Sequence, residues 1–427
     1  MAYVISICGA GGKTTLCYDL ANEYLKQNLK VAVTTTTHMW CTDDFIDIKG
    51  ISNLKNIENK IYSIGKIDKK NKKVLGLGFK EIDSIYNLFD IIIIEADGSR
   101  NMPFKIPDIE KEPVIYDKTN EILVVYGLSS IGRKIGVVCH RYYEKQKEID
   151  KLNEKIKSKQ YKNISETINE NTIVKKELLE LFYDEFYKKP LEEKYKNIKI
   201  NLCLIDMTKK KNFLRYNKLS FVLLASGESK RFGKENKLLK EIKNMPMYRL
   251  MIEKILEVKT RLELTLAEYM HKVQINIDVV SIYDEIMDEV EHRDEIEYIY
   301  NDNAKKGMSS SIILSTKKNI ESDAIVFFNS DMPLINPIEI SNMIFYTMCS
   351  NKGLGAMFYD IPKNPAFIGQ KYFKNLVSLN GDIGAKEMLN EDIDDLYKYH
   401  IDREQLSDID TIEDYEKILL NFVENVI

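Results

Sequence analysis

Two segments in the second half of the chain combine residue types that could bind a phosphate and a divalent metal ion. Gly227, Arg231 and Lys237 follow an apolar run, residues 221–225, which we interpret as a buried strand of a parallel sheet. Beyond the carboxyl end of such a strand a glycine lets the backbone approach a phosphate, and cations add charge to the same anion. Another apolar run leads to Asp331, whose carboxylate on a rigid strand end could fix the ion. We assign catalysis to Arg231, Lys237 and Asp331, against the alternative of a solvated turn with surface lysines.

Further residues of this half are candidates for contact with a nucleotide. The basic loop also contains Ser229 and Gly233, and a later helix start contains Gly307, Ser309 and Ser310. Serine hydroxyls and free backbone amides at a helix start can contact a base or a phosphate. An ordinary helix N-cap is the alternative for the serines.

Acidic residues near the C-terminus could complete a metal site. Asp410 in the segment DIDT is the candidate for a second ligand beside Asp331, with Asp408 as its rival and a helix N-cap as the alternative. Asp382, in NGDIGAK, could serve the metal or the acceptor substrate, or it could form a turn before a helix starting at Ala385.

The first half of the chain opens with a separate phosphate-binding pattern. An apolar run, residues 3–8, leads into a glycine loop and then a helical pattern. Backbone amides at the helix start can hold phosphate oxygens, the lysine reaches a terminal phosphate, and a threonine hydroxyl can ligate Mg²⁺. The strict pattern G-x-x-x-x-G-K-[ST] would need glycine where Ile7 stands. The predicted nucleotide contacts are Gly9, Gly11, Gly12, Lys13, Thr14 and Thr15, with Thr14 also a metal ligand.

Two more strand ends in this half carry polar residues. The apolar tetrad 91–94 leads into Glu95 and Asp97, either of which could hold Mg²⁺ opposite the glycine loop. Four consecutive threonines after a strand at 30–33 precede His38, a candidate ligand or base for the substrate. A lone histidine is more often a packed side chain, so this assignment depends on its position alone.

The elements that must position these residues form an alternation of short apolar runs and helical patterns, which predicts an α/β fold. We expect two Rossmann-like domains: residues 1–215, a P-loop-type nucleotide-binding domain, and residues 216–427, a second domain with a doubly wound sheet. Residues 141–199 read as charged surface helices without a site, and the basic string 208–218 as the linker.

Composition limits the classes of partner and compartment. The 62 Lys and Arg are balanced by 66 Asp and Glu, so we expect no nucleic-acid partner. The six cysteines are dispersed without a C-x-x-C pair, which suits a reducing cytoplasm better than a disulfide framework or a zinc site. No apolar run approaches the length of a membrane span, and no leader pattern is visible, so we expect no membrane partner.

The motifs of the second half resemble a known family. The segment from Leu224 to Lys237 is similar to the L-A-A-G-x-S-x-R-M-G-x-x-K signature of MobA-like nucleotidyltransferases, with Ser226 and Phe232 as departures. With GMSSS, NSDMP, KNPAF, NGDIGAK and DIDT, it looks like the subgroup that includes molybdenum cofactor cytidylyltransferase. The resemblance implies Mg²⁺, CTP or another nucleoside triphosphate, and molybdopterin as substrate, with Asp331 as the metal-binding aspartate of the family.

The first half resembles another family. GAGGKTT, VTTTTHM, EADGS and EPVI are similar to the YqeC family of accessory proteins for selenium-dependent molybdenum hydroxylases, over residues 1 to about 140. This implies an ATP-like nucleotide in the first domain and a molybdenum hydroxylase as client. Leu204-Ile205-Asp206 stands where a guanine-reading N-K-x-D would need Asn and Lys, so guanine selectivity is not supported.

These observations leave more than one function open. The first is a fusion protein that transfers a nucleotidyl group, CMP from CTP, to molybdopterin with release of pyrophosphate. A sugar-nucleotide pyrophosphorylase would use the same loop and Asp331, although GMSSS and NGDIGAK argue against it. A carrier or insertion chaperone that binds nucleotide or cofactor without turnover is the remaining alternative.

Overall fold

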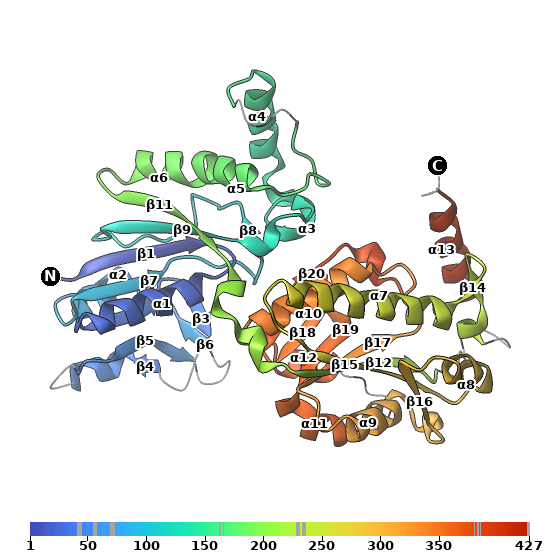
Figure 1. The fold of residues 1–427 in the computed structure, drawn as a ribbon. Helices are drawn as coiled ribbons and strands as arrows, with labels where there is room; N and C mark the ends of the chain where they lie inside the picture. The colour runs from blue at the N-terminus through green and yellow to red at the C-terminus, as the bar shows by residue number, and fades with distance from the viewer. Residues whose placement is uncertain are drawn as a thin grey trace. The chain divides into compact units, whose positions relative to one another are not determined.

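The computed structural model describes residues 1–40, 45–53, 58–68, 73–161, 164, 166–227, 231–232, 236–379, 381, 384 and 386–424. The chain divides into two compact units, Met1–Met207 and Thr208–Ile427. Each unit contains its own sheet with helices on both faces (Figure 1). None of the helices in the described part of the chain combines the length and the apolar character that crossing a bilayer requires.

The sheet of the first unit is mostly parallel, as the α/β prediction requires. Its order is β11-β9-β1-β7-β2-β5-β6-β3, and β4 pairs with β5. The chain moves from β1 outward to β2, returns through β7, and crosses to β9 on the other side, so β1 is a topological switch point. The bounds are β1 (Tyr3–Gly9), β2 (Val31–Thr35), β3 (His38–Trp40), β4 (Phe45–Asp47), β5 (Ile61–Asp68), β6 (Lys73–Leu75), β7 (Ile91–Glu95), β9 (Glu121–Gly127) and β11 (Lys199–Ile205).

Alternating side chains of these strands form the core on both faces of the sheet. Ile5, Ile93 and Val125 pack with α1, whereas Ile92 and Ile122, with the opposite phase, pack beneath the other helices. The charged segment predicted as surface helices does form helices, and their apolar side chains complete this core. The helices are α1 (Lys13–Lys26), α2 (Phe79–Ile85), α3 (Ile135–Val138), α4 (Gln146–Lys157), α5 (Lys176–Tyr183) and α6 (Lys189–Lys194).

The sheet of the second unit has the order β16-β15-β12-β17-β19-β18-β20. The pairs on either side of β12 are parallel, but β19 runs antiparallel to both of its neighbours, so the sheet is mixed. The strands are β12 (Lys218–Ala225), β15 (Gln274–Ser281), β16 (Ile296–Tyr300), β17 (Ala324–Asn329), β18 (Leu354–Phe358), β19 (Pro362–Gly369) and β20 (Leu396–His400).

Helices cover both faces of this second sheet as well (Figure 1). The neighbouring helices α7 and α10 lie on one face, and α9, α11 and α12 pack on the other. The helices are α7 (Met247–Ala267), α8 (Asp284–Glu291), α9 (Met308–Lys318), α10 (Pro337–Cys349), α11 (Phe373–Val377), α12 (Lys386–Glu391) and α13 (Ile412–Glu424).

The predicted linker, residues 208–218, is part of the second unit. It forms short 3-10 turns and then the start of β12. Phe213 is fully buried against Tyr269 and Phe345, and Arg215 donates to the carbonyl oxygens of Ser350 and Lys352. Reading this basic string as a linker was therefore wrong, because one aromatic side chain anchors it in the core.

We expect Phe213→Ala to destabilise the second unit by about 3–5 kcal/mol, since it removes a buried aromatic ring. Leu214→Ala is the matched control, because the neighbouring Leu214 is 45% exposed. This substitution should change stability by less than about 0.5 kcal/mol. Calorimetric unfolding of the full chain measures both. If both substitutions lowered the free energy of unfolding equally, Phe213 would not be a core residue and the segment would be a linker.

Candidate functional site

The sheet of the second unit brings the predicted phosphate loop and the predicted metal ligand to the same edge. β12 and β17 are parallel neighbours in which Leu224 lies opposite Asn329. Both strands therefore end at the same level, and Ser330 donates to the carbonyl oxygen of Leu224 at 2.8 Å. The segments that begin at Ser226 and at Asp331 start side by side from these strand ends.

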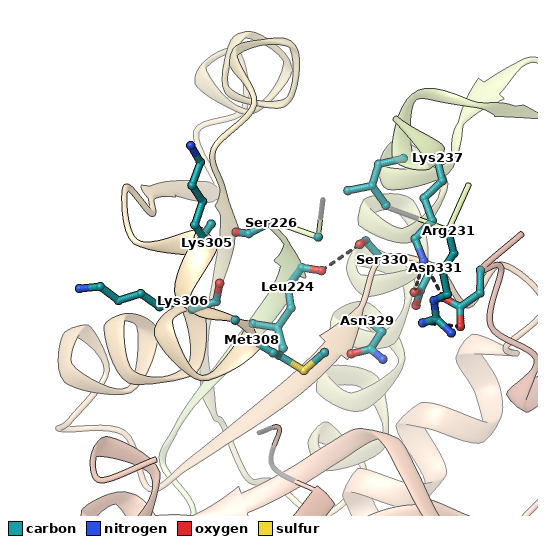
Figure 2. A pocket seen from close by; sticks show the side chains of 16 residues that line it. Leu224, Ser226, Arg231, Lys237, Lys305, Lys306, Met308, Asn329, Ser330 and Asp331 are labelled. Carbon is teal, nitrogen blue, oxygen red and sulfur yellow. Dashed lines mark hydrogen bonds and ion pairs between the residues drawn. The ribbon is translucent and has the colours of Figure 1, made fainter. Parts of the chain in front are cut away.

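Lys237 connects the acidic residues of this edge. Its ammonium nitrogen lies 2.7 Å from Oδ2 of Asp331 and 3.2 Å from Oδ1 of Asp410, and it also donates to the carbonyl oxygen of Ile409 at 2.7 Å. Arg231 reaches the other oxygen, Oδ2, of Asp410 at 3.0 Å. Figure 2 shows Lys237, Arg231 and Asp331 gathered at one end of the pocket. Four residues predicted from three separate motifs thus form one charge cluster.

The electrostatics of the cluster distinguish Asp410 from its rival Asp408. Burial alone would lower the pKa of Lys237, but Asp331 and Asp410 raise it above its ordinary value, so the ammonium stays charged. Asp408 pairs instead with Lys363 at 3.1 Å. Burial, helped by the charge of Asp331, raises the pKa of Asp408. Asp410 is therefore the carboxylate that shares a cation with Asp331.

This cluster lines a cavity of about 490 Å³. Such a volume suits a small-molecule ligand. Among the predicted residues, those that line it are Gly227, Arg231, Lys237, Gly307, Asp331 and Asp410. Figure 2 shows Lys305, Lys306 and Met308 across the cavity from Lys237. Lys305 and Lys306 were not predicted as site residues, although a pair of cations directly before Gly307 is itself a signal for phosphate.

The serines at the start of α9 are placed differently from the prediction. Ser309 is buried and donates to the carbonyl oxygen of Gly381, and Ser310 donates to that of Gly307. Ser311 lines the cavity, and the side-chain amide of Asn301 donates to the hydroxyl oxygen of Ser311 at 2.8 Å. The helical rotation of about 100° per residue turns the neighbouring positions away. The remaining candidates of this half, Ser229, Gly233 and Asp382, lie outside the described residues.

The donor set of the cavity fits a hard divalent cation. Oδ1 of Asp331 is buried and has no hydrogen-bond partner among the described residues. The described residues contain no group of three or more acidic, histidine or cysteine side chains that could hold a metal by themselves. Mg²⁺ commonly takes one or two carboxylates and completes its shell with water and substrate phosphates. Asp331 and Asp410 meet that requirement.

In the first unit, packing explains the glycines of the loop between β1 and α1. Gly11 has a φ of +81°, and a Cβ atom there would lie 2.5 Å from the carbonyl oxygen of Pro103. Gly9, with a φ of +97°, would place a Cβ atom 2.2 Å from the carbonyl oxygen of Val125. Both positions therefore require glycine whether or not a phosphate binds.

The charged residues of this loop contact the end of the neighbouring strand β7. Lys13 is buried and lies 3.3 Å from Oδ1 of Asp97 and 3.6 Å from Oε1 of Glu95. Thr14 donates to Oε2 of Glu95 at 2.8 Å. Burial raises the pKa of Glu95, against the opposing effect of Lys13. Glu95, rather than Asp97, is thus the carboxylate beside the threonine hydroxyl.

Asp97 is engaged by groups other than a metal ion. Its Oδ2 accepts from the backbone N–H of Gly9 at 3.0 Å and from Lys105 at 2.8 Å. No sequence pattern had pointed to Lys105, which is fully buried. Thr15 and His38 are exposed. Neither of them, nor any glycine of the loop, lines the cavity of about 490 Å³ or a second cavity of about 280 Å³ in the first unit.

Family models match both units. Residues 221–396 match the MobA-like NTP transferase domain, and residues 5–143 match the YqeC protein family. The second unit therefore carries an NTP transferase domain. The chain joins it to a YqeC region, the combination that the resemblance of the motifs predicted.

Individual relatives match one half of the chain at a time. The YqeC protein of Escherichia coli K12 is 36% identical over 148 residues, which are 33% of this chain and 57% of that protein. A nucleotidyl transferase from Methanothermobacter thermautotroptrophicus is 17% identical with a TM-score of 0.40, covering 48% of this chain and 98% of its own. Molybdopterin-guanine dinucleotide biosynthesis protein A from Archaeoglobus fulgidus is 13% identical with a TM-score of 0.34, covering 48% and 99%.

Replacing three glycines of the first unit by alanine, one at a time, separates the effect of close packing on stability from the effect of a positive φ. Gly11→Ala should lower stability most, because it adds both a clash and the roughly 1–3 kcal/mol of a left-handed alanine. At Gly132 φ is positive, but no atom lies within 4 Å of the added Cβ atom. At Gly98 there is neither a positive φ nor an atom within 4 Å of the added Cβ atom. Thermal unfolding should rank the losses Gly11, Gly132, Gly98. A Gly11→Ala protein as stable as wild type would show that the loop is not packed as described.

Replacing Lys237 tests the metal site without any substrate. In Lys237→Met the carboxylates of Asp331 and Asp410 lose their shared cation, so we expect Mn²⁺ to bind about tenfold or more tightly than in wild type. Lys254→Met is the control, because Lys254 is a partly buried lysine of the same unit that donates to the carbonyl oxygen of Ile335 and lies outside the cavity. Titration followed by electron paramagnetic resonance of free Mn²⁺ measures both. Unchanged or weaker binding in Lys237→Met would argue against Asp331 and Asp410 as a joint metal site.

Proposed function

We propose that the second unit transfers a nucleotidyl group from a nucleoside triphosphate to a phosphate-bearing acceptor, with release of pyrophosphate. The observation that carries this proposal is the meeting of Arg231 and Lys237 with Asp331 and Asp410 at one end of a cavity of ligand size. Cations that neutralise a triphosphate and carboxylates that hold Mg²⁺ are the groups that this reaction needs.

The residues act by position and charge. Asp331 and Asp410 would hold Mg²⁺, which when bound supplies further neutralisation of the triphosphate. Lys237 exchanges its carboxylate partners for phosphate oxygens, and Arg231 holds the departing pyrophosphate. An oxygen of the acceptor phosphate attacks the α-phosphorus in line, and the bond from that phosphorus to the oxygen bridging to the β-phosphate breaks. A phosphate acceptor is already ionised, so the cavity needs no general base.

Lys305 and Lys306 support a phosphate on the acceptor. Both are exposed cations of the cavity wall opposite Lys237, at the end of the cavity away from the carboxylates (Figure 2). A triphosphate held by Lys237 leaves these lysines free to bind a separate anion. For the particular reaction we propose CMP transfer from CTP to molybdopterin, supported by the match to the MobA-like domain and by the motifs GMSSS and NGDIGAK.

For the first unit we propose an accessory nucleotide-binding role in the maturation of a cytoplasmic molybdenum hydroxylase. The match to the YqeC family supports it, as does the contact of Thr14 with Glu95, a hydroxyl and a carboxylate that fit Mg²⁺ beside a phosphate loop. Lys13 would have to leave Asp97 and Glu95 to reach a terminal phosphate.

A pyrophosphate-release assay tests the transferase. The full chain is incubated with each ribonucleoside triphosphate in turn, with molybdopterin, with a sugar 1-phosphate, or with no acceptor. Pyrophosphate that appears only with CTP and molybdopterin is the expected result. Release with the sugar phosphate would favour the pyrophosphorylase alternative, and nucleotide binding without any release would favour the carrier.

Lys237→Ala should lower turnover by roughly 100- to 1,000-fold, as for other pre-organised charge stabilisers. Lys254→Ala, outside the cavity, should keep most of the activity. Circular dichroism of both proteins shows whether they are folded. Normal turnover in a folded Lys237→Ala protein would exclude the assigned role.

A further inference from the structure

The first unit contains a second polar pocket that the glycine loop does not use. Its volume is about 280 Å³, and it is lined by Ser99, Arg100, Glu112, His140, Arg141 and Glu144 around the backbone of Gly98. Gly98 to Arg100 follow β7, and Glu112 follows β8 (Phe104–Lys105). His140 ends β10 (Cys139–His140), which pairs with β8, and Arg141 and Glu144 follow it. A short parallel pairing of strands therefore holds the two walls together.

The carboxylates at this pocket already have partners. Glu112 accepts from Lys105 at 3.2 Å and pairs with Nη2 of Arg141 at 3.2 Å. Glu144 lies 3.7 Å from Nε of Arg141. Beneath the pocket, Lys105 also donates to Asp97 and to the carbonyl oxygen of Gly98. Negative charge in the wall is thus neutralised from within the protein.

The groups that remain without a partner include hydrogen-bond donors and cations. Nη1 of Arg141 is buried and makes no hydrogen bond with any described residue. The imidazole of His140, only 8% exposed, also has no hydrogen-bond partner in the described part of the chain. Arg100 is exposed, with no carboxylate of the described residues paired to it. A buried donor without a partner costs about 1–3 kcal/mol, so an acceptor belongs there when the pocket is filled.

Three cations act on the imidazole of His140. Burial, together with the charges of Lys105, Arg141 and Arg100, lowers the pKa of His140 to about 4. The imidazole is therefore neutral at pH 7 and can donate one hydrogen bond without adding a further charge.

The backbone of both arginines is strained. Arg100 has a φ of +49° and Arg141 a φ of +67°, a left-handed conformation that glycine, asparagine and aspartate adopt more readily than arginine. Strain of this kind is characteristic of sites where a side chain must be held in a particular place.

We propose that this pocket binds a small oxyanion, a phosphate or a carboxylate, between the guanidinium groups of Arg100 and Arg141 and the imidazole of His140. Guanidinium groups bind both classes of oxyanion with charge-assisted hydrogen bonds. Asp97 links the pocket to the glycine loop, because its Oδ2 accepts from both Lys105 and the N–H of Gly9. The site is independent of nucleotidyl transfer in the second unit.

The test observes His140 directly in the full chain. Isotope-labelled histidine is incorporated, the signal of His140 is assigned with His140→Gln, and inorganic phosphate or acetate is titrated at pH 7. We expect a saturable shift of the His140 signal, while those of His271 and His400 in the other unit stay in place. Saturation by only one of the anions identifies the class of ligand.

A matched pair of variants attributes the shift to the pocket. Arg141→Asn removes the guanidinium while asparagine tolerates the positive φ, and should weaken binding about tenfold or more. Lys176→Gln removes an exposed cation of α5 outside the pocket and should leave binding unchanged. Arg100→Asn serves if Arg141→Asn does not fold. A His140 signal that responds to neither anion in the wild-type protein would overturn the proposal.

Discussion

A buried ammonium group between two carboxylates organises one end of the cavity in the second unit. Lys237 is 10% exposed, and without Asp331 and Asp410 its charge would not be stable in that position. The same contact joins three distant parts of the chain: the loop after β12, the end of β17 and the segment before α13. Because Lys237 also donates to the carbonyl oxygen of Ile409, moving the C-terminal segment away would remove two of the groups that stabilise this buried cation, Ile409 and Asp410. In the proposed reaction, a ligand that brings phosphate and Mg²⁺ would replace both partners, with phosphate bound to the lysine and Mg²⁺ to the carboxylates.

Both units use a similar arrangement, but they differ in how accessible it is. In each, a lysine that follows a strand and a glycine-containing loop reaches a carboxylate at the end of the neighbouring parallel strand: Lys13 with Asp97, and Lys237 with Asp331. The side chains of Lys13 and Asp97 are 3% and 0% exposed, whereas Asp331 and Asp410 are 20% and 36% exposed and line the large cavity. The second unit can therefore accept a ligand with little rearrangement. Nucleotide binding in the first unit requires Lys13 to move out of a closed cluster.

The sequence predicted strand ends well because short apolar runs followed by glycine and charged residues have few other interpretations. In each unit that rule located a lysine after one strand and a carboxylate at the end of another: Lys13 and Glu95 in the first unit, Lys237 and Asp331 in the second. Parallel pairing of the strands then brings the two side chains of each unit together. The rule gave the wrong structure where the packing of a single side chain determines how a segment folds. Phe213 lies in a basic string that reads as a linker, and its packing against Tyr269 and Phe345 depends on contacts distant in the sequence. The choice among Ser309, Ser310 and Ser311 depends on the rotation of a helix whose first residue the pattern does not define. The antiparallel direction of β19 has no local signal at all.

No sequence pattern pointed to Lys105, and the energetics of its buried ion pairs favour a functional reason for a lysine at this position. Its side chain is fully buried and contacts Asp97, Glu112 and the carbonyl oxygen of Gly98. Replacing a buried ion pair by apolar groups of similar size is often neutral or stabilising, so stability alone does not require a lysine there. The lysine does something that an apolar residue could not: it holds Asp97 against the glycine loop and Glu112 against Arg141. One buried cation thus sets the position of groups at two sites, and its removal should disturb both the loop that follows β1 and the pocket lined by Arg141.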